Sequence, residues 1–294
     1  MKVLLAGASG LIGTALVPAL RAAGHEVRRL VRRPPEGTDG VAWDPGRLQI
    51  DPRAFADIDA VVNLSGENIG AGRWSASRRE RIFHSRVDAT RTLVMAIAAL
   101  ARKPSIFISA SAAGYYGDRG DELLTERSEI GHGFLPEVCL AWETHAEGAA
   151  RVGVRTARLR LGVVLAEEGG AIGRMAPLFK LGLGGRLGHG RQWMPWISLD
   201  DAVRAILHIL THPHCEGAYN LTAPEPVTNA DFTRALAGVL HRPAVLPAPA
   251  WALRLALGRM ADEALLASTR ALPERLTREG FKFRHPEVRL ALEF

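Results

Sequence analysis

Three glycines near the start of the chain have the spacing of a phosphate-binding turn. Gly7, Gly10 and Gly13 follow the apolar run at residues 3–6 and open an amphipathic stretch, residues 11–23. In a strand–turn–helix unit the first glycine permits a tight turn, the second lets a pyrophosphate approach, and the third lets helix and strand pack closely. The phosphates then meet the free N–H groups of the helix start. The spacing predicts a dinucleotide site; the alternative is an ordinary glycine-rich turn.

Two arginines end the second predicted strand, where the adenosine ribose of a dinucleotide would lie. An acidic residue at this place usually holds the 2′-hydroxyl of NAD, whereas an arginine accommodates the 2′-phosphate of NADP. Arg32 and Arg33 stand there without an acid, and guanidinium groups suit bidentate phosphate recognition. We therefore expect NADP as the cofactor, with NAD less favoured. The alternative is that both arginines are simply solvated.

Small residues close two further predicted strands. Leu64, Ser65 and Gly66 belong to the segment that ends one strand, and Ser109 ends the next. Because the carboxyl ends of parallel strands face the ligand crevice, small residues there would let a nicotinamide ribose approach. For the first of these segments, a purely structural turn is the alternative.

Residues 109–117 make a resemblance to a known family specific. With the other matching stretches, they resemble the extended, sugar-nucleotide-epimerase-like branch of the short-chain dehydrogenase/reductase superfamily. The resemblance is closer to atypical members with a small C-terminal domain of unknown function. The matching stretches span the chain: residues 7–13, 63–69, Trp74, 85–86, 114–117, 162–165, 195–197 and 273–283. The resemblance implies NADP-dependent oxidoreductase or epimerase activity, with cofactor contacts at Gly7, Ser9, Gly10, Leu11, Ile12, Arg32, Leu64, Ser65, Arg86 and Val163.

The chain departs from this superfamily at the catalytic dyad. Members transfer hydride with a tyrosine and a lysine four residues later, aided by a serine, because the lysine lowers the tyrosine pKa. None of the three tyrosines here has a lysine four residues on. Cys139 and Glu143 occupy the positions of the dyad, and Ser111 matches the serine.

Two kinds of group could replace the dyad in proton transfer. Tyr115 and Tyr116 follow a strand end near the expected nicotinamide, so either could donate a proton. Glu143 lies one helical turn after Cys139 and would share its face, and a buried carboxyl there could act as acid or base. The alternatives are that the tyrosines pack the loop and that Glu143 forms an ion pair or lies on the helix surface. The predicted catalytic residues are therefore Ser111, Tyr115, Tyr116 and Glu143.

Composition argues against several other classes of protein. Of the 294 residues, 47% are hydrophobic and 23% charged, enough for a sizeable core. The formal net charge is +6, but the basic residues are dispersed and lack interleaved aromatics, so we expect no nucleic-acid partner. No apolar run reaches the roughly 18 residues of a membrane helix, and the first residues predict a strand instead of a leader. We expect no membrane partner and a cytoplasmic location.

A metal site is not expected either. The segment 212–215, with two histidines and a cysteine, looks like a ligand cluster. Adjacent residues in a loop broken by proline rarely converge on one ion, however, so a surface turn is favoured.

The predicted fold class is α/β: a Rossmann-type doubly wound parallel sheet with a small, mostly helical C-terminal substrate lobe. Short apolar runs alternate with helical patterns, as strands buried on both faces require. The predicted strands are 2–6, 26–31, 60–64, 105–109, 155–161 and 217–221, and the main helices are 11–23, 75–101, 136–151 and 200–211. The NAD(P)-binding domain is expected over residues 1–164 plus 199–215, and the substrate lobe over 165–198 plus 216–294.

The expected function is that of an NADP-dependent oxidoreductase or epimerase. Its small-molecule substrate, a sugar derivative or a similar compound, would lie between the two lobes. A non-catalytic NADP-binding sensor or regulatory protein is the alternative, because the dyad is missing. The sequence leaves the substrate, the reaction direction and the oligomeric state open.

Overall fold

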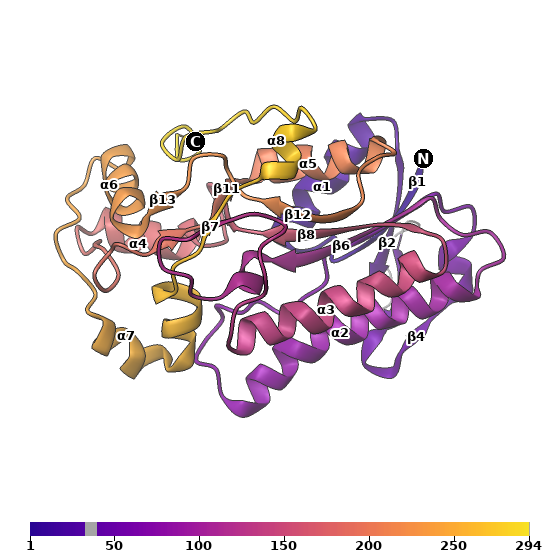
Figure 1. Ribbon diagram of the computed structural model, residues 1–294, viewed down its shortest axis with the longest axis horizontal. Helices are drawn as coiled ribbons and strands as arrows, with labels where there is room; N and C mark the ends of the chain where they lie inside the picture. Colours follow the sequence, from indigo (N-terminus) through magenta and orange to yellow (C-terminus); the bar gives the residue numbers. More distant parts are fainter. Residues whose placement is uncertain (33–39, 294) are drawn as a thin grey trace.

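An eight-stranded sheet forms the centre of the computed structural model, which describes residues 1–32 and 40–293 (Figure 1). The strand order is β12-β8-β6-β5-β1-β2-β3-β4, and its paired neighbours are parallel except β3 with β4. With helices on both faces, this is the predicted doubly wound sheet, and the fold class is confirmed. The strands are β1 (Lys2–Ala6), β2 (Glu26–Val31), β3 (Gly40–Asp44), β4 (Gln49–Ile50), β5 (Ala60–Asn63), β6 (Ile106–Ala112), β8 (Arg155–Leu161) and β12 (Gly217–Leu221).

Helices bury both faces of this sheet. Along β1, Val3 and Leu5 join the core formed with α1 and α5, whereas Leu4 and Ala6 join the core formed with α2 and α3. This alternation is why the central strands β1 and β5 consist mainly of apolar residues. In Figure 1, α2 and α3 lie side by side on one face, and α1 and α5 lie on the other. The helices are α1 (Leu11–Ala22), α2 (Ala76–Ala99), α3 (Phe134–Arg151) and α5 (Leu199–Thr211).

Most predicted elements have the expected bounds to within a few residues, but the edge of the sheet was missed. Strands β3 and β4 were not predicted, because β3 buries only Trp43 and β4 is only two residues long. The strand predicted at 105–109 continues to Ala112. Short 3-10 turns follow three strands: η1 (Pro45–Arg47), η2 (Pro52–Phe55) and η3 (Ala113–Tyr116).

The smaller lobe is assembled from segments on either side of α5. It has its own core, in which Phe179, Trp196 and Phe232 are buried. Its short strands pair as β9 (Val163–Leu165) with β11 (Trp196–Ser198) and as β10 (Trp193–Met194) with β13 (Val227–Thr228). Its helices are α4 (Ile172–Lys180), α6 (Asn229–Val239), α7 (Ala250–Leu257) and the π-helical segment Ala261–Leu266, whereas α8 (Glu274–Arg278) packs against β12 and buries Leu276 in the core of the main sheet.

One predicted domain boundary is wrong. Residues from 216 onward were expected in the substrate lobe, but β12 pairs in parallel with β8 and forms an edge of the main sheet. Its last four residues are buried, so the strand was recognised while its partner was not, because β8 lies some sixty residues earlier in the chain. None of the described helices is long and apolar enough to cross a membrane.

The C-terminal segment is tied to the loop that follows η3. Strand β14 (Arg270–Ala271) pairs in parallel with β7 (Leu123–Leu124). Just before β14, the Ser268 N–H donates to Asp118 Oδ1 at 3.1 Å, and the Thr269 hydroxyl donates to the Gly117 carbonyl at 2.8 Å. The end of the chain therefore holds the loop after Tyr115 and Tyr116 in place.

Candidate active site

The glycine turn between β1 and α1 cannot accommodate side chains at its first and third glycines. Gly7 has a φ of 82°, and a Cβ there would lie 2.6 Å from the Leu64 carbonyl carbon. A Cβ on Gly13 would overlap the Gly7 carbonyl. At Gly10, by contrast, a Cβ would meet only the Gly7 oxygen, at 3.4 Å. The turn is therefore tight at its ends and open at the middle glycine, as the spacing predicted.

The N-terminus of α1 has unsatisfied donors. Gly10 is the N-cap and supplies no side-chain cap, and the first turn contains no acidic residue. In the described part of the chain, no acceptor receives a hydrogen bond from the N–H groups of Leu11, Ile12 or Gly13. Ser9 is exposed beside them. Free N–H groups at a helix start, with the positive end of the dipole, form an anion site.

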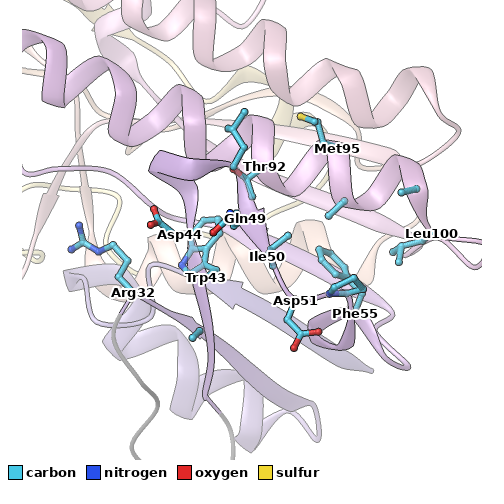
Figure 2. Close-up of a pocket in the computed structure, with 15 residues that line it drawn as sticks. Arg32, Trp43, Asp44, Gln49, Ile50, Asp51, Phe55, Thr92, Met95 and Leu100 are labelled. Atoms are coloured by element: carbon cyan, nitrogen blue, oxygen red, sulfur yellow. The ribbon is translucent and has the colours of Figure 1, made fainter.

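A cavity of about 810 Å³ lies between the β3–β4 edge of the sheet and the C-terminal part of α2. Figure 2 shows Arg32 at one end of it, near Asp44, and Leu100 at the other. The Asp44 carboxylate accepts a hydrogen bond from the Arg47 N–H at 3.2 Å and so caps η1. Arg32 is exposed, so its guanidinium is accessible to an anion. Arg33 lies outside the described residues.

The loop after β5 approaches both the glycine turn and Arg86. The Leu64 N–H donates to the Ala6 carbonyl at 2.9 Å, and the Ser65 N–H donates to Asn63 Oδ1 at 3.1 Å. A Cβ on Gly66 would lie 3.2 Å from the Arg86 guanidinium carbon.

Arg86 is anchored beneath this loop. Its guanidinium donates to the Glu67 carbonyl and to the Ile82 carbonyl, both at 3.0 Å, and lies 5.2 Å from the ring centre of Trp142. Burial lowers the pKa of Arg86, although the nearby Glu67 carboxylate opposes the shift. The structure thus brings Leu64, Ser65, Gly66 and Arg86 together next to the glycine turn.

Ser111 and Glu143 meet in a buried polar cluster. The Ser111 hydroxyl donates to Glu143 Oε1 at 2.7 Å. Arg160 donates to the same oxygen at 2.9 Å and to Oε2 at 3.0 Å, and all three side chains are at least 95% buried. Burial opposes the charge of Arg160, but the hydrogen bonds and charge of Glu143 outweigh it and raise the arginine pKa. Glu143 is a bidentate ion-pair partner, which was one of the alternatives for it.

The two tyrosines have different environments. Tyr116 is fully buried; its hydroxyl donates to Asn220 Oδ1 at 2.7 Å and receives a hydrogen bond from Arg160 at 3.0 Å. Burial raises the pKa of Tyr116 to about 12. Tyr115 is partly exposed, and the Arg160 guanidinium carbon lies 3.5 Å from its ring centre. Tyr116 holds the loop together, and Tyr115 is the tyrosine that a ligand can reach.

Three further residues singled out in the sequence, Cys139, Ser109 and Val163, differ in exposure. Cys139, in the dyad's tyrosine position, is buried with its thiol 3.7 Å from the Ala112 carbonyl, and burial raises its pKa to about 12. Ser109 is buried within β6 and does not end the strand, so the reason for placing it at the crevice is wrong. The Val163 N–H donates to the Pro195 carbonyl at 2.7 Å, where the chain enters the lobe.

Sequence reasoning missed Arg160. It lies on β8 directly opposite Ser111 of β6. Arg158, two residues earlier, lies 3.7 Å from Glu143 Oε2 and forms an ion pair with Glu147. Arginines two residues apart in a buried strand share one face, and buried charges need partners. The spacing of two residues between Arg158 and Arg160 was the sequence signal that could have revealed this buried ion pair.

The sheet, the glycine turn and the crossover helices define a Rossmann-type protein. The chain belongs to the NAD dependent epimerase/dehydratase family, whose model matches residues 3–222. A second model, Domain of unknown function (DUF1731), matches residues 248–294. The predicted resemblance, including the C-terminal domain of unknown function, is confirmed.

Relatives extend over the whole chain. An epimerase family protein of Mycobacterium bovis is 46% identical over 292 residues, covering 99% of this chain and 96% of its own. The crystal structure of human epimerase family protein SDR39U1 with NADPH has a TM-score of 0.90 at 32% identity, covering 100% of this chain and 98% of its own. A nucleoside-diphosphate sugar epimerase from Corynebacterium glutamicum has a TM-score of 0.82 at 36% identity, covering 99% of this chain and 57% of its own.

Proposed function

We propose that this protein is an NADP-dependent oxidoreductase or epimerase acting on a small substrate, a sugar derivative or a similar compound. The observation that carries the proposal is the open glycine turn at α1, where three N–H groups find no acceptor among the described residues and the first turn has no acid. Such a helix start suits a pyrophosphate. The human relative solved with NADPH, which matches this chain along its full length, supports the choice of cofactor.

The residues along this edge of the sheet fit a dinucleotide. The space at Gly10 would admit the pyrophosphate, and Arg32 would face the 2′-phosphate from the end of β2. Leu64, Ser65 and Arg86 would hold the nicotinamide half. When bound, such a cofactor supplies a hydride donor or acceptor.

Tyr115 is the residue we assign to proton transfer. Of the four predicted catalytic residues it alone is partly exposed, since Ser111, Tyr116 and Glu143 are buried. Arg160 fixes its ring from one side, and Glu143 fixes Arg160 through both carboxylate oxygens. Glu143 and Arg160 are therefore positioning residues in this proposal. The Ser111 hydroxyl donates to Glu143 Oε1 and helps to hold that carboxylate, so Ser111 is a positioning residue as well.

A non-catalytic NADP-binding sensor is the second candidate. The observation that favours it is the pair of residues in the dyad positions. Cys139 is a buried thiol with a pKa of about 12, and the Glu143 carboxylate is occupied by Arg160 and Ser111. Neither arrangement reproduces a phenol beside an ammonium.

Two measurements test the proposal. Calorimetric titration is expected to show one dinucleotide site that prefers NADPH to NADH. NADPH oxidation is then followed against a panel of aldehydes, ketones and nucleotide sugars. Failure to bind either dinucleotide refutes the site itself. Tight NADPH binding without turnover across the panel favours the sensor.

A further inference from the structure

A second group of potential ligands lies outside the cleft, where α5, β12 and α8 meet. It contains His208 in the last turn of α5, Cys215 in the turn before β12, and Glu279 directly after α8. One ligand atom from each residue lies within 4.8 Å of the other two. Imidazole, thiolate and carboxylate together are a typical donor set for zinc.

The thiol and carboxylate lie a few tenths of an ångström closer together than tetrahedral coordination of one cation would place them, so a small outward shift would admit the ion. With metal–sulfur bonds of about 2.3 Å and metal–oxygen bonds of about 2.0–2.2 Å, the sulfur and oxygen atoms of a tetrahedral site lie roughly 3.5–3.7 Å apart. Cys215 Sγ lies 3.3 Å from Glu279 Oε2. In the metal-free protein the thiol donates a hydrogen bond across this distance, which a cation between the two atoms would replace.

Burial and an unpaired nitrogen point the same way. Cys215 is fully buried. The Nε2 of His208 is also buried, and no hydrogen-bond partner for it exists among the described residues. A buried polar atom without a partner costs free energy, so this imidazole would gain from a ligand.

Neighbouring groups hold the three side chains in place. Arg155 donates to the carbonyls of His212 and Cys215, at 3.0 and 2.6 Å, and so fixes the turn that carries the thiol. The Tyr219 hydroxyl lies 3.0 Å from both Glu279 oxygens. Outer contacts of this kind orient metal ligands.

We infer that His208, Cys215 and Glu279 form a binding site for a zinc-like divalent cation, which would fasten the C-terminal segment to α5 and β12. Only Cys215 comes from the segment 212–215 that looked like a ligand cluster in the sequence. The His212 ring instead stacks on that of His208, with centroids 3.9 Å apart. The site does not depend on the proposed function, because the three ligands lie outside the proposed cleft residues.

Cobalt(II) titration of the chelator-treated, tag-free full-length protein tests the site. One equivalent is expected to produce the near-ultraviolet band of cobalt–thiolate ligation and the visible bands of tetrahedral cobalt. Cys215→Ser should abolish the thiolate band, whereas Cys139→Ser, which changes the only other cysteine, should keep it. His208→Gln and Glu279→Gln should each weaken binding by roughly a hundredfold or more, and His214→Gln should not.

Thermal unfolding supplies a second readout. Zinc should raise the melting temperature of the wild type and of His214→Gln, but not that of His208→Gln. This holds even if Cys215→Ser fails to fold, because His208→Gln keeps the thiol. Cobalt binding without a thiolate band, or equal affinity in wild type and His208→Gln, overturns the inference.

Discussion

Replacing Glu143 by glutamine tests whether the buried cluster works as an ion pair. The substitution keeps the side chain's size but removes the negative charge that faces Arg160. Three hydrogen bonds of 2.7–3.0 Å converge on this carboxylate from Ser111 and Arg160, and both charged side chains are 5% exposed. Glu143→Gln would therefore leave a buried guanidinium without its counter-charge.

The expected cost follows from this geometry. Breaking a buried pair by removing one partner costs about 3–5 kcal/mol. With roughly 2–4 °C of melting temperature per kcal/mol in a large domain, the midpoint should fall by roughly 6–20 °C. Glu147→Gln is the matched control, because Glu147 lies one turn further along α3, pairs with Arg158 and is 44% exposed. An exposed pair of this kind is worth about 1 kcal/mol or less.

Thermal unfolding followed by circular dichroism measures both changes, and a double variant completes the cycle. Glu143→Leu with Arg160→Met should be more stable than Glu143→Leu alone, because no unpaired charge remains buried. If Glu143→Gln shifts the midpoint no further than Glu147→Gln does, the cluster is not the buried pair described here. The same conclusion would follow if the stability losses of Glu143→Leu and Arg160→Met simply added up in the double variant.

The remaining predictions concern the cleft. Gly10→Val should fold normally, because its Cβ meets only one atom at 3.4 Å, but calorimetry should show that it no longer binds NADPH. Gly13→Ala should instead lower the melting temperature. If Gly10→Val unfolds while Gly13→Ala stays stable and loses NADPH, the role assigned to the turn is wrong. Arg32→Ala should reduce NADPH affinity roughly ten- to a hundredfold while sparing NADH, and an equal loss for both would argue against a 2′-phosphate contact. Tyr116→Phe should lower the free energy of unfolding by about 1–3 kcal/mol, because it leaves the buried partners of the hydroxyl without their hydrogen bonds. Tyr115→Phe should keep the stability and lower the turnover rate about a hundredfold or more. An unchanged rate for Tyr115→Phe would show that Tyr115 does not transfer the proton.

The elements that the sequence predicted well are those defined by local pattern. β1, β2 and β8 have the predicted bounds, because each is a short segment whose own apolar residues are buried and mark it as a strand. β3 was missed because it is near the edge of the sheet and buries only Trp43. β12 was recognised as a strand but placed in the lobe, because local pattern does not say which strand it pairs with.

The candidate site divides in the same way. The glycine turn was predictable, since Gly7 and Gly13 meet steric limits within a few residues of chain. The partner of Glu143 was not predicted, because Glu143 lies on α3 and Arg160 on β8, and local pattern does not show which helix residue faces which strand residue. Which tyrosine is accessible depends on Asn220, more than a hundred residues away.

The contact between the C-terminal segment and the loop after Tyr116 also bears on synthesis of the chain. Ser268 holds Asp118 across 150 residues. A ribosome adding roughly 5–20 residues per second needs roughly 8–30 s to cover that distance. The glycine turn and its helix can form while the chain is still growing, but the loop beside Tyr115 must wait for the last strand to emerge. A nascent chain released before residue 268 would therefore carry a complete glycine turn beside an unanchored loop.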